Sequence, residues 1–419
     1  MNYPLFSLLF SLLCCASACS ALQIQARKPQ AQIGIQVRSV KSGKILYEEN
    51  PNQKFIPAST LKIFTLATAL HVLGPSYRFE TQVFYDGNLY LKGSGDPSFS
   101  VHSLNHLAGQ IRQLIKTPIK NIIIDDSVFD GNYYGNGWLE EDLPKGYSAP
   151  ISGINVNYNR LVVGFLPGQK ILLDPDTQFV KLKFHKNGNF NITGHGMAIS
   201  GHIPVIDKAQ YKTFSISDPN LWAGFLFKEA LKRVGIKITG HIQSGLVPQK
   251  LTPITTHYSA YLSELAINHT KFSNNLANEA LLKTLGSGSF EKGLEKVRAF
   301  VGCEGIADGS GLSVLSSISP AQMTDFLVKI AHDFQIAPEF MTALPIAGKD
   351  GSLAHSFQKE PFLSHMRAKT GMMTSVRALA GYFKPPNGDM VAFALFANEL
   401  KSPPEKLRAW LELILSKNI

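Results

Sequence analysis

Beyond its first 21 residues, the 419-residue chain has little cysteine and no long apolar run. Cys14, Cys15 and Cys19 all precede Ala21, so Cys303 alone would remain after processing there, which excludes an intramolecular disulfide in the processed chain. No segment after Ala21 is apolar enough to span a membrane. Histidine and cysteine show no zinc-ligand spacing, and we expect neither a metal nor an organic cofactor.

Acidic residues are the minority among the charged side chains, with 31 Asp and Glu against 41 Lys and Arg. The basic residues are scattered, and no nucleic-acid-binding motif accompanies them, so we expect no nucleic-acid partner. A solvated basic surface explains this charge most simply. Attraction to an anionic cell wall or to lipid headgroups, as a peripheral membrane contact, is the alternative.

Residues 1–21 are typical of a secretory signal peptide, with an apolar run at 5–13 followed by small residues up to Ala21. We therefore expect export of the chain. The segment has no Lys or Arg before the apolar run, and Cys19 follows Ala-Ser-Ala. An uncleaved anchor and lipid attachment at Cys19 thus stay open beside ordinary cleavage.

Alternating apolar and polar residues over 33–47 predict a β-hairpin whose apolar positions face the core. A helix should begin at Pro57 and end before Gly74, which places Ser59 near its N-terminus.

Between about Tyr77 and Tyr258 the pattern changes to short strands with frequent Gly, Pro and Asn, which indicates an insertion. Within it, Asp218 should start a helix that Gly235 ends, and residues 236–238 are expected to form a strand.

After Ser259 the periodicity is helical again, over 262–267, 276–285 and 320–332. Two mostly apolar strands, 376–383 and 390–397, should then pair as an antiparallel hairpin. A last helix over 405–417 has one apolar stripe, which we expect to pack on a sheet rather than lie on a membrane.

Ser59 and Lys62 are one helical turn apart, so the lysine can reach the serine hydroxyl. Serine is a weak nucleophile near neutral pH and needs an adjacent base. A lysine acts as base only when burial or a second cation, such as Lys369, lowers its pKa. Taken alone, this S-x-x-K spacing is also common on solvated helix faces, but here Lys62 lies in an apolar helix.

Ser273-Asn274-Asn275 offers a hydroxyl that can relay a proton and an amide that can hold Lys62 or a substrate carbonyl. The same tripeptide would also serve as an N-cap or turn before the next helix. Lys369-Thr370-Gly371 starts an apolar strand, and a cation with a hydroxyl there suits a terminal carboxylate bound along a strand edge. The alternative is an ordinary surface strand start.

The three motifs in this order occur together in penicillin-binding proteins and class A β-lactamases. With the segments 91–97, 308–313 and 344–353, and with Gly137-Trp138 and Asp142-Leu143-Pro144, the chain resembles peptidase family S13. These are D-alanyl-D-alanine carboxypeptidases of the penicillin-binding protein 4 type. The resemblance runs from residue 33 to about residue 398 and implies a periplasmic enzyme.

The fold class implied by the resemblance is α+β: a transpeptidase-like, serine β-lactamase-like domain with an antiparallel sheet flanked by helices. A large, mostly-β insertion of two smaller domains interrupts it. The expected limits are residues 22–77 with 259–419 for the catalytic domain, 78–160 with 230–258 for inserted domain II, and 161–229 for inserted domain III.

The resemblance also implies roles for the motif residues. Ser59 would be the acylated nucleophile, Lys62 its base, and Ser273 with Asn275 the proton relay and support. Lys369, Thr370 and Gly371 would form the carboxylate site, and the backbone N–H groups of Ser59 and Met372 the oxyanion hole.

Asp142 stands where a family acid contacts the amino group of diaminopimelate, although an ordinary surface acid is the alternative. The chain departs from the usual family pattern at three positions, which are Met372 in place of Thr, Asn274 in place of Asp, and His355 in place of Arg. None of these changes removes a catalytic group.

We therefore expect a serine D-alanyl-D-alanine carboxypeptidase and endopeptidase that acts on peptidoglycan peptides and is acylated by β-lactams. A homodimer stays open. A β-lactamase is disfavoured because no E-x-x-L-N motif follows Ser273, and a Ser-His-Asp hydrolase because G-x-S-x-G is missing. An inactive peptidoglycan-binding protein with the same fold is the remaining alternative.

Overall fold

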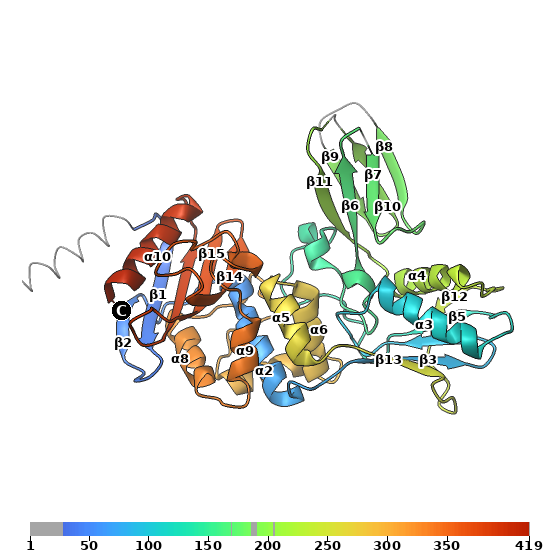
Figure 1. Cartoon of the computed structure of the whole chain (residues 1–419), viewed down its shortest axis with the longest axis horizontal. Coiled ribbons are helices and arrows are strands. Elements are labelled where there is room, and N and C mark those ends of the chain that lie inside the picture. Colours follow the sequence, from blue (N-terminus) through green and yellow to red (C-terminus); the bar gives the residue numbers. More distant parts are fainter. Residues whose placement is uncertain (1–27, 169, 186–190, 204–205, 419) are drawn as a thin grey trace, which may run out of the picture. The chain divides into compact units, whose positions relative to one another are not determined.

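The computed structural model describes residues 28–168, 170–185, 191–203 and 206–418 (Figure 1). The predicted signal peptide, including Cys19, lies outside these residues. The chain packs as two compact units, the first formed by the chain up to Thr60 and from Ser316 onward, the second by Leu61–Leu315. The domain limits expected from the sequence stay a prediction. No helix of the described part is both long and apolar enough to cross a membrane.

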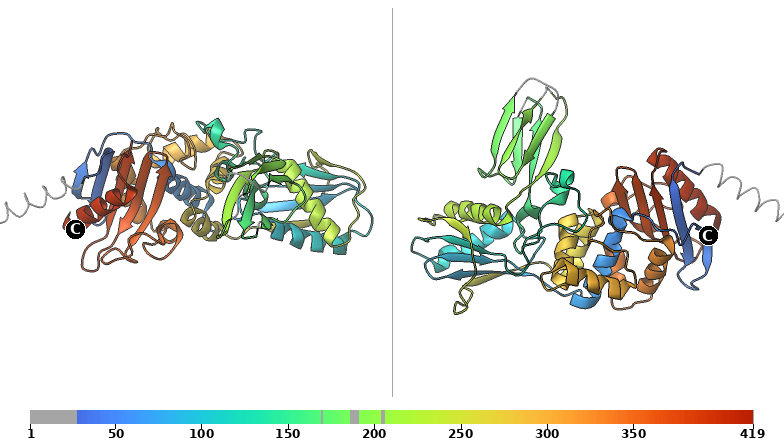
Figure 2. Two further views of the ribbon diagram at one scale, coloured as in Figure 1. Left: turned by 90° about the horizontal axis from the view of Figure 1, so that it is seen from above. Right: turned by 180° about the vertical axis from the view of Figure 1, so that it is seen from behind.

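The first unit is built on a five-stranded sheet in the order β14-β15-β16-β1-β2, with every neighbouring pair antiparallel (Figures 1 and 2). Both predicted hairpins are confirmed within it. Its elements are β1 (Gln32–Ser39), β2 (Ile45–Glu49), η1 (Ala58–Leu61), α8 (Pro320–Ala331), α9 (Ala337–Ala343), η5 (Gly351–Leu353), β14 (Met366–Met373), β15 (Val376–Phe383), β16 (Val391–Asn398) and α10 (Pro404–Asn418).

Helices cover both faces of this sheet. Successive residues of a strand point to opposite faces, so neighbouring residues of β1 contact different helices. On one face, Ile35 is fully buried in a cluster that contains Trp410 and Leu411 of α10. On the other face, Thr324 of α8 donates a hydrogen bond to the side-chain oxygen of Gln36. The prediction that the last helix packs on the sheet is confirmed.

The second unit combines a helical part with the inserted strands. In the helical part, α2 packs against α5, α6 and α7, and α6 also packs against α7. The predicted helices of this part are confirmed, with α2 preceded by the single 3-10 turn η1 that carries Ser59. The helices are α2 (Lys62–Leu73), α5 (Leu262–Lys271), α6 (Asn275–Leu285) and α7 (Phe290–Val301).

The inserted strands form three sheets, with the orders β12-β5-β4-β3-β13, β11-β6-β7 and β8-β10-β9. One buried apolar cluster spans α3, α4 and strands of all three sheets. The elements are β3 (Glu80–Tyr85), β4 (Leu89–Lys92), α3 (Val101–Leu114), β5 (Ile122–Asp125), η2 (Glu140–Asp142), η3 (Gly146–Ser148), η4 (Val156–Asn159), β6 (Arg160–Leu166), β7 (Lys170–Asp174), β8 (Lys181–His185), β9 (Asn191–His195), β10 (Ala198–His202), β11 (Gln210–Ser215), α4 (Pro219–Arg233), β12 (Ile242–Ser244) and β13 (Thr255–Tyr258).

One strand prediction in this region is wrong. Residues 236–238 form no strand beyond the single bridge of Ile238 with Ile119, and the strand of this segment is β12, four residues further on. The backbone N–H groups of Thr239 and Gly240 donate to the carbonyls of Ile119 and Lys120, so regular pairing with β5 begins only at Ile242. The helix that precedes this segment, α4, starts at Asp218-Pro219 as predicted, and the side chain of Asp218 caps it by accepting from the N–H of Leu221.

Replacing either of two helical glycines of the second unit with alanine should change the stability of the unit, in opposite directions for the two positions. A Cβ at Gly109 in α3 would meet nothing within 4 Å, so Gly109→Ala should stabilise the unit by about 0.5–1 kcal/mol. A Cβ at Gly293 in α7 would lie 2.1 Å from the carbonyl oxygen of Leu282, so Gly293→Ala should destabilise it by about 1–3 kcal/mol. Thermal unfolding of both variants measures this, and shifts of equal sign would contradict the packing described.

Candidate active site

The motif residues divide between the two units. The first unit holds Ser59, Lys369, Thr370, Gly371 and Met372, and the second holds Lys62, Asp142, Ser273 and Asn275. The chain passes from one unit to the other between Thr60 and Leu61, inside the S-x-x-K motif itself.

In the first unit, the Lys369–Gly371 strand lies directly beside the segment that leads to Ser59. A Cβ on Gly371 would lie 2.8 Å from the carbonyl oxygen of Pro57 and 3.1 Å from the Cβ of Ala58. Ala58 itself has a left-handed backbone, with φ 45°. Glycine is therefore required at position 371 by the approach of the chain's own backbone, in addition to any approach of a substrate.

β14 is an edge strand, and residues 369–372 are part of it. Lys369 is fully buried and donates to the backbone oxygen of Thr370 at 2.8 Å. The Thr370 hydroxyl donates to the hydroxyl of Ser352 at 2.7 Å, while Met372 is 71% exposed. A cavity of about 300 Å³ is lined by Thr370, Gly371 and Met372 among others. An extended peptide could therefore add to this edge next to a cation and a hydroxyl.

In the second unit, the Lys62 ammonium group is fully buried at the start of α2. Its Nζ donates to Oδ1 of Asn275 and to the backbone oxygen of Ser310, each at 2.6 Å. The structure thus brings together Lys62 and Asn275, two of the residues predicted for the site. It also adds a carbonyl that the sequence interpretation did not include.

Burial lowers the pKa of Lys62 from 10.5 to about 7, because the charged form loses its hydration. The charges of Asp308 and Glu279 act in the opposite direction and prevent a larger fall. Burial, together with the nearby Asp308, raises the pKa of Glu279 to about 8. A substantial fraction of Lys62 is therefore neutral near pH 7, as a general base requires.

Ser273 occupies a strained turn between α5 and α6. Its φ is 56°, in the left-handed region that a residue with a side chain adopts at some cost. The turn is closed by the N–H of Ser273 bonding to Thr270 and by the N–H of Asn274 bonding to His269. Asn274 also caps α6, since its side chain accepts from the N–H of Ala277 at 3.0 Å. The motif thus forms the helix cap that its residue types favour.

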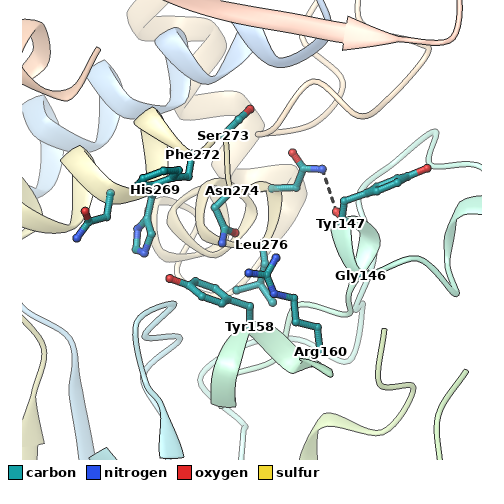
Figure 3. A pocket seen from close by; sticks show the side chains of 11 residues that line it. Gly146, Tyr147, Tyr158, Arg160, His269, Phe272, Ser273, Asn274 and Leu276 are labelled. Atoms are coloured by element: carbon teal, nitrogen blue, oxygen red, sulfur yellow. Dashed lines mark hydrogen bonds between the residues drawn. The ribbon is translucent and has the colours of Figure 1, made fainter. Parts of the chain in front are cut away.

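Both ends of the Asn275 amide are used. Oδ1 accepts from Lys62. Nδ2 donates to the backbone oxygen of Tyr147 at 2.9 Å, and this hydrogen bond is the dashed line that ends at Tyr147 in Figure 3. Asn275 therefore links α2 to the inserted segment that contains Asp142. This double contact fixes the orientation of the amide and gives the oxygen, and not the nitrogen, to Lys62.

Asp142 is largely buried and already has partners. Its Oδ1 accepts from Nζ of Lys145 at 2.6 Å and from the hydroxyl of Tyr147 at 2.7 Å. The side chain of Asp142 is 14% exposed, against 50% for Lys145. A substrate amine would therefore have to share or displace the Lys145 ammonium at this carboxylate.

The sequence did not predict a role for Glu279 and Asp308, the two carboxylates whose charges act on Lys62. Glu279 accepts from the N–H groups of Gly309 and Ser310, at 3.0 and 2.8 Å. Asp308 accepts from the N–H of Gly311 at 2.8 Å and from the indole of Trp138 at 3.1 Å. The available signal was a carboxylate on the apolar face of a predicted helix, which needs buried partners. In the described part of the chain, no cluster of three or more His, Cys, Asp or Glu side chains could hold a metal ion.

The comparisons with known proteins show the family of the chain. The model of the D-Ala-D-Ala carboxypeptidase 3 (S13) family matches residues 17–415. A D-alanyl-D-alanine carboxypeptidase of Actinomadura sp. (strain R39) is 29% identical, over 88% of this chain and 78% of its own.

Two solved structures show the same fold. The crystal structure of penicillin binding protein 4 (dacB) from Haemophilus influenzae matches with a TM-score of 0.82 at 23% identity, covering 94% of this chain and 98% of its own. Bd3459, a predatory peptidoglycan endopeptidase from Bdellovibrio bacteriovorus, matches with a TM-score of 0.57 at 15% identity, covering 93% and 94%.

Replacing Glu279 should show how far this carboxylate supports the Lys62 region. Glu279→Leu leaves the buried N–H groups of Gly309 and Ser310 without an acceptor, at a cost of about 1–3 kcal/mol for each group. Glu279→Gln keeps one acceptor oxygen and should therefore lose less stability than Glu279→Leu. Chemical denaturation of the two variants tests this, and equal stabilities for Leu and Gln would contradict the assigned role.

Proposed function

Because this chain belongs to the S13 family of D-Ala-D-Ala carboxypeptidases, we propose that it is a serine-type D-alanyl-D-alanine carboxypeptidase and endopeptidase of peptidoglycan. It attacks the carbonyl of a D-Ala peptide bond, releases D-Ala or a cross-linked stem peptide, and transfers the acyl group to water. Both activities share this acyl-enzyme step and differ only in the leaving amine. The observation that carries the proposal is the fully buried Lys62, whose Nζ is held by Asn275 and Ser310 and whose burial favours the neutral form that a general base needs.

In the proposed reaction, neutral Lys62 takes the proton of the Ser59 hydroxyl as the oxygen attacks the carbonyl carbon. The backbone N–H groups of Ser59 and Met372 stabilise the oxyanion of the tetrahedral intermediate. Ser273 relays the proton to the leaving amine, and Asn275 holds Lys62 in place. Water then hydrolyses the acyl-Ser59 ester.

The proposed substrate lies along the edge of β14, with its terminal carboxylate bound by Lys369 and Thr370. Support comes from the edge position of the strand, whose outer pairing with residues 345–347 ends at Ala368, from the buried cation and from the Thr370 hydroxyl beside Ser352. Asp142 would bind a side-chain amine of the stem peptide in competition with Lys145. We further propose export to the periplasm and covalent inhibition by β-lactams at Ser59.

Benzylpenicillin should form a stable adduct on the wild-type chain and none on Ser59→Ala. The acyl-serine cannot form without the hydroxyl, and Lys62→Ala should acylate only very slowly because it lacks the base. Intact-protein mass spectrometry measures the adduct directly. Full labelling of either variant would reject the assigned roles.

If the wild-type chain forms no adduct, two explanations remain, and measuring the benzylpenicillin left in solution distinguishes them. Disappearance of benzylpenicillin from solution would indicate a β-lactamase, and its persistence an inactive binding protein. Once an adduct is found, digestion of muropeptides would measure how the activity divides between release of D-Ala and cleavage of cross-links.

The rate of acylation should rise with pH and level off above pH 7, since Lys62 is active when neutral and its pKa is about 7. Asn275→Asp places a carboxylate against Nζ, which should raise the pKa of Lys62 and move the midpoint of the profile to higher pH. Stopped-flow acylation from pH 5.5 to 9.5 measures both. A wild-type rate that still climbs tenfold per pH unit above pH 8, or an unshifted variant, would contradict Lys62 as the base.

A further inference from the structure

Behind the Ser273–Asn275 turn, the second unit contains a cavity of about 450 Å³ (Figure 3). One wall is formed by this turn and the end of α5, and the other by Tyr158 and Arg160. None of the residues that line the cavity is an aspartate or a glutamate. The cavity is therefore adjacent to the catalytic motif and carries a net positive charge.

Arg160 supplies this charge without a protein counter-ion. Among the described residues, its guanidinium group makes no hydrogen bond or ion pair, and it lies over the ring of Tyr158, at 4.8 Å from the centroid. Asp174 lies near enough to act on it electrostatically, but forms no ion pair with it. Burial lowers the pKa of Arg160, yet a guanidinium remains protonated near neutral pH. A partly buried charge that lacks a partner is well suited to an anionic ligand.

The backbone that presents Tyr158 and Arg160 to the cavity is strained. Asn157, Tyr158 and Asn159 all have left-handed φ values, of 50°, 58° and 50°. Such residues persist where their surroundings hold them, and they cluster at ligand sites. Here Asn159 holds the turn, since its Nδ2 donates to the carbonyl of Pro150 and to Oδ1 of Asn155, both at 2.9 Å. These hydrogen bonds of Asn159 thus fix the backbone that carries Arg160.

The opposite wall adds further hydrogen-bond donors. Oδ1 of Asn274 is occupied by the N–H of Ala277, which leaves its NH₂ group available, and in Figure 3 this group and the guanidinium of Arg160 face the same space. The Ser273 hydroxyl points away from the cavity. His269 is fully buried, and burial lowers its pKa to about 4, so it contributes no charge. A ligand here would contact the turn without competing for the Ser273 hydroxyl.

We propose that this cavity is a subsite for a carboxylate of the peptidoglycan stem peptide, with Arg160 as its principal ligand and the Tyr158 hydroxyl and Asn274 amide as further donors. The inference rests on the proposed function and goes beyond its acylation centre. The planar fork of the guanidinium matches a carboxylate with two parallel hydrogen bonds. A seated carboxylate would also contact Asn274, the residue between Ser273 and Asn275. The subsite therefore favours acidic stem peptides over their amidated forms.

The test uses peptides that end in D-Ala-D-Ala and carry a carboxylate, or its primary amide, at one of two positions. In one pair the group is on the residue directly before D-Ala-D-Ala, and in the other it is one residue further away. Wild type should cleave the acid of at least one pair with a kcat/KM about tenfold to a hundredfold above that of its amide. Arg160→Met should bring this ratio close to one, and Arg160→Lys should retain part of it. Arg112→Met, an exposed arginine on α3, is the matched control and should keep the wild-type ratio.

Binding to Ser59→Ala, which does not turn over, separates this proposal from the proposed function. Calorimetry should show the acidic peptide binding about tenfold or more tightly than its amide, and the preference should vanish in the Ser59→Ala, Arg160→Met double variant. This result supports the subsite even if wild type neither cleaves peptide nor reacts with benzylpenicillin, in which case only the proposed function fails. Equal affinity for acid and amide, an unchanged preference without Arg160, or no binding would overturn the subsite.

Discussion

The buried ammonium group of Lys62 is the constraint on which the rest of this structure depends. A lysine enters a protein interior only if its charge is compensated or given up, and here both occur in part. Asn275 and the Ser310 carbonyl satisfy two of its hydrogen-bonding directions, while burial moves its pKa toward neutrality. The same side chain is therefore held in one place and kept close to its neutral form.

Much of the second unit serves to keep these two acceptors in position. Ser310 follows Asp308 in a loop whose N–H groups are bound by Glu279 of α6, and α6 also begins with Asn275. One helix thus supplies a direct ligand of Lys62 at its first residue and the support for the other ligand one turn later. The charges of Asp308 and Glu279 limit the fall of the pKa of Lys62, although Glu279, with a pKa of about 8, carries only part of its charge near pH 7. The chemistry is accordingly set by a balance between burial and two carboxylates.

The first unit contributes a strand edge instead of a base. β14 lies at the end of an antiparallel sheet, and its outer side is bonded to Pro345 and Ala347 only as far as Ala368, so an extended peptide would add to the strand beyond Ala368. Gly371 permits this strand to run against Pro57 and Ala58, just before Ser59. The nucleophile and the carboxylate site of the proposed mechanism therefore belong to one packed unit. The S-x-x-K motif crosses the unit boundary and joins them covalently to Lys62.

The sequence by itself determined the features that depend on local pattern and motif chemistry. Period-2 apolar alternation marked the first hairpin of the central sheet and two mostly apolar runs marked the second, helical periodicity marked α6, α8 and α10, and residue types marked Asn274 as a cap. Three short motifs predicted the reacting groups of the proposed mechanism, because its chemistry allows few substitutes. Only the tertiary structure showed the partners of Lys62, the left-handed φ of Ser273 and a guanidinium of Arg160 that has no ion-pair partner among the described residues. These depend on residues far apart in the chain, whose packing sets desolvation, backbone strain and charge balance, and no local pattern encodes those quantities.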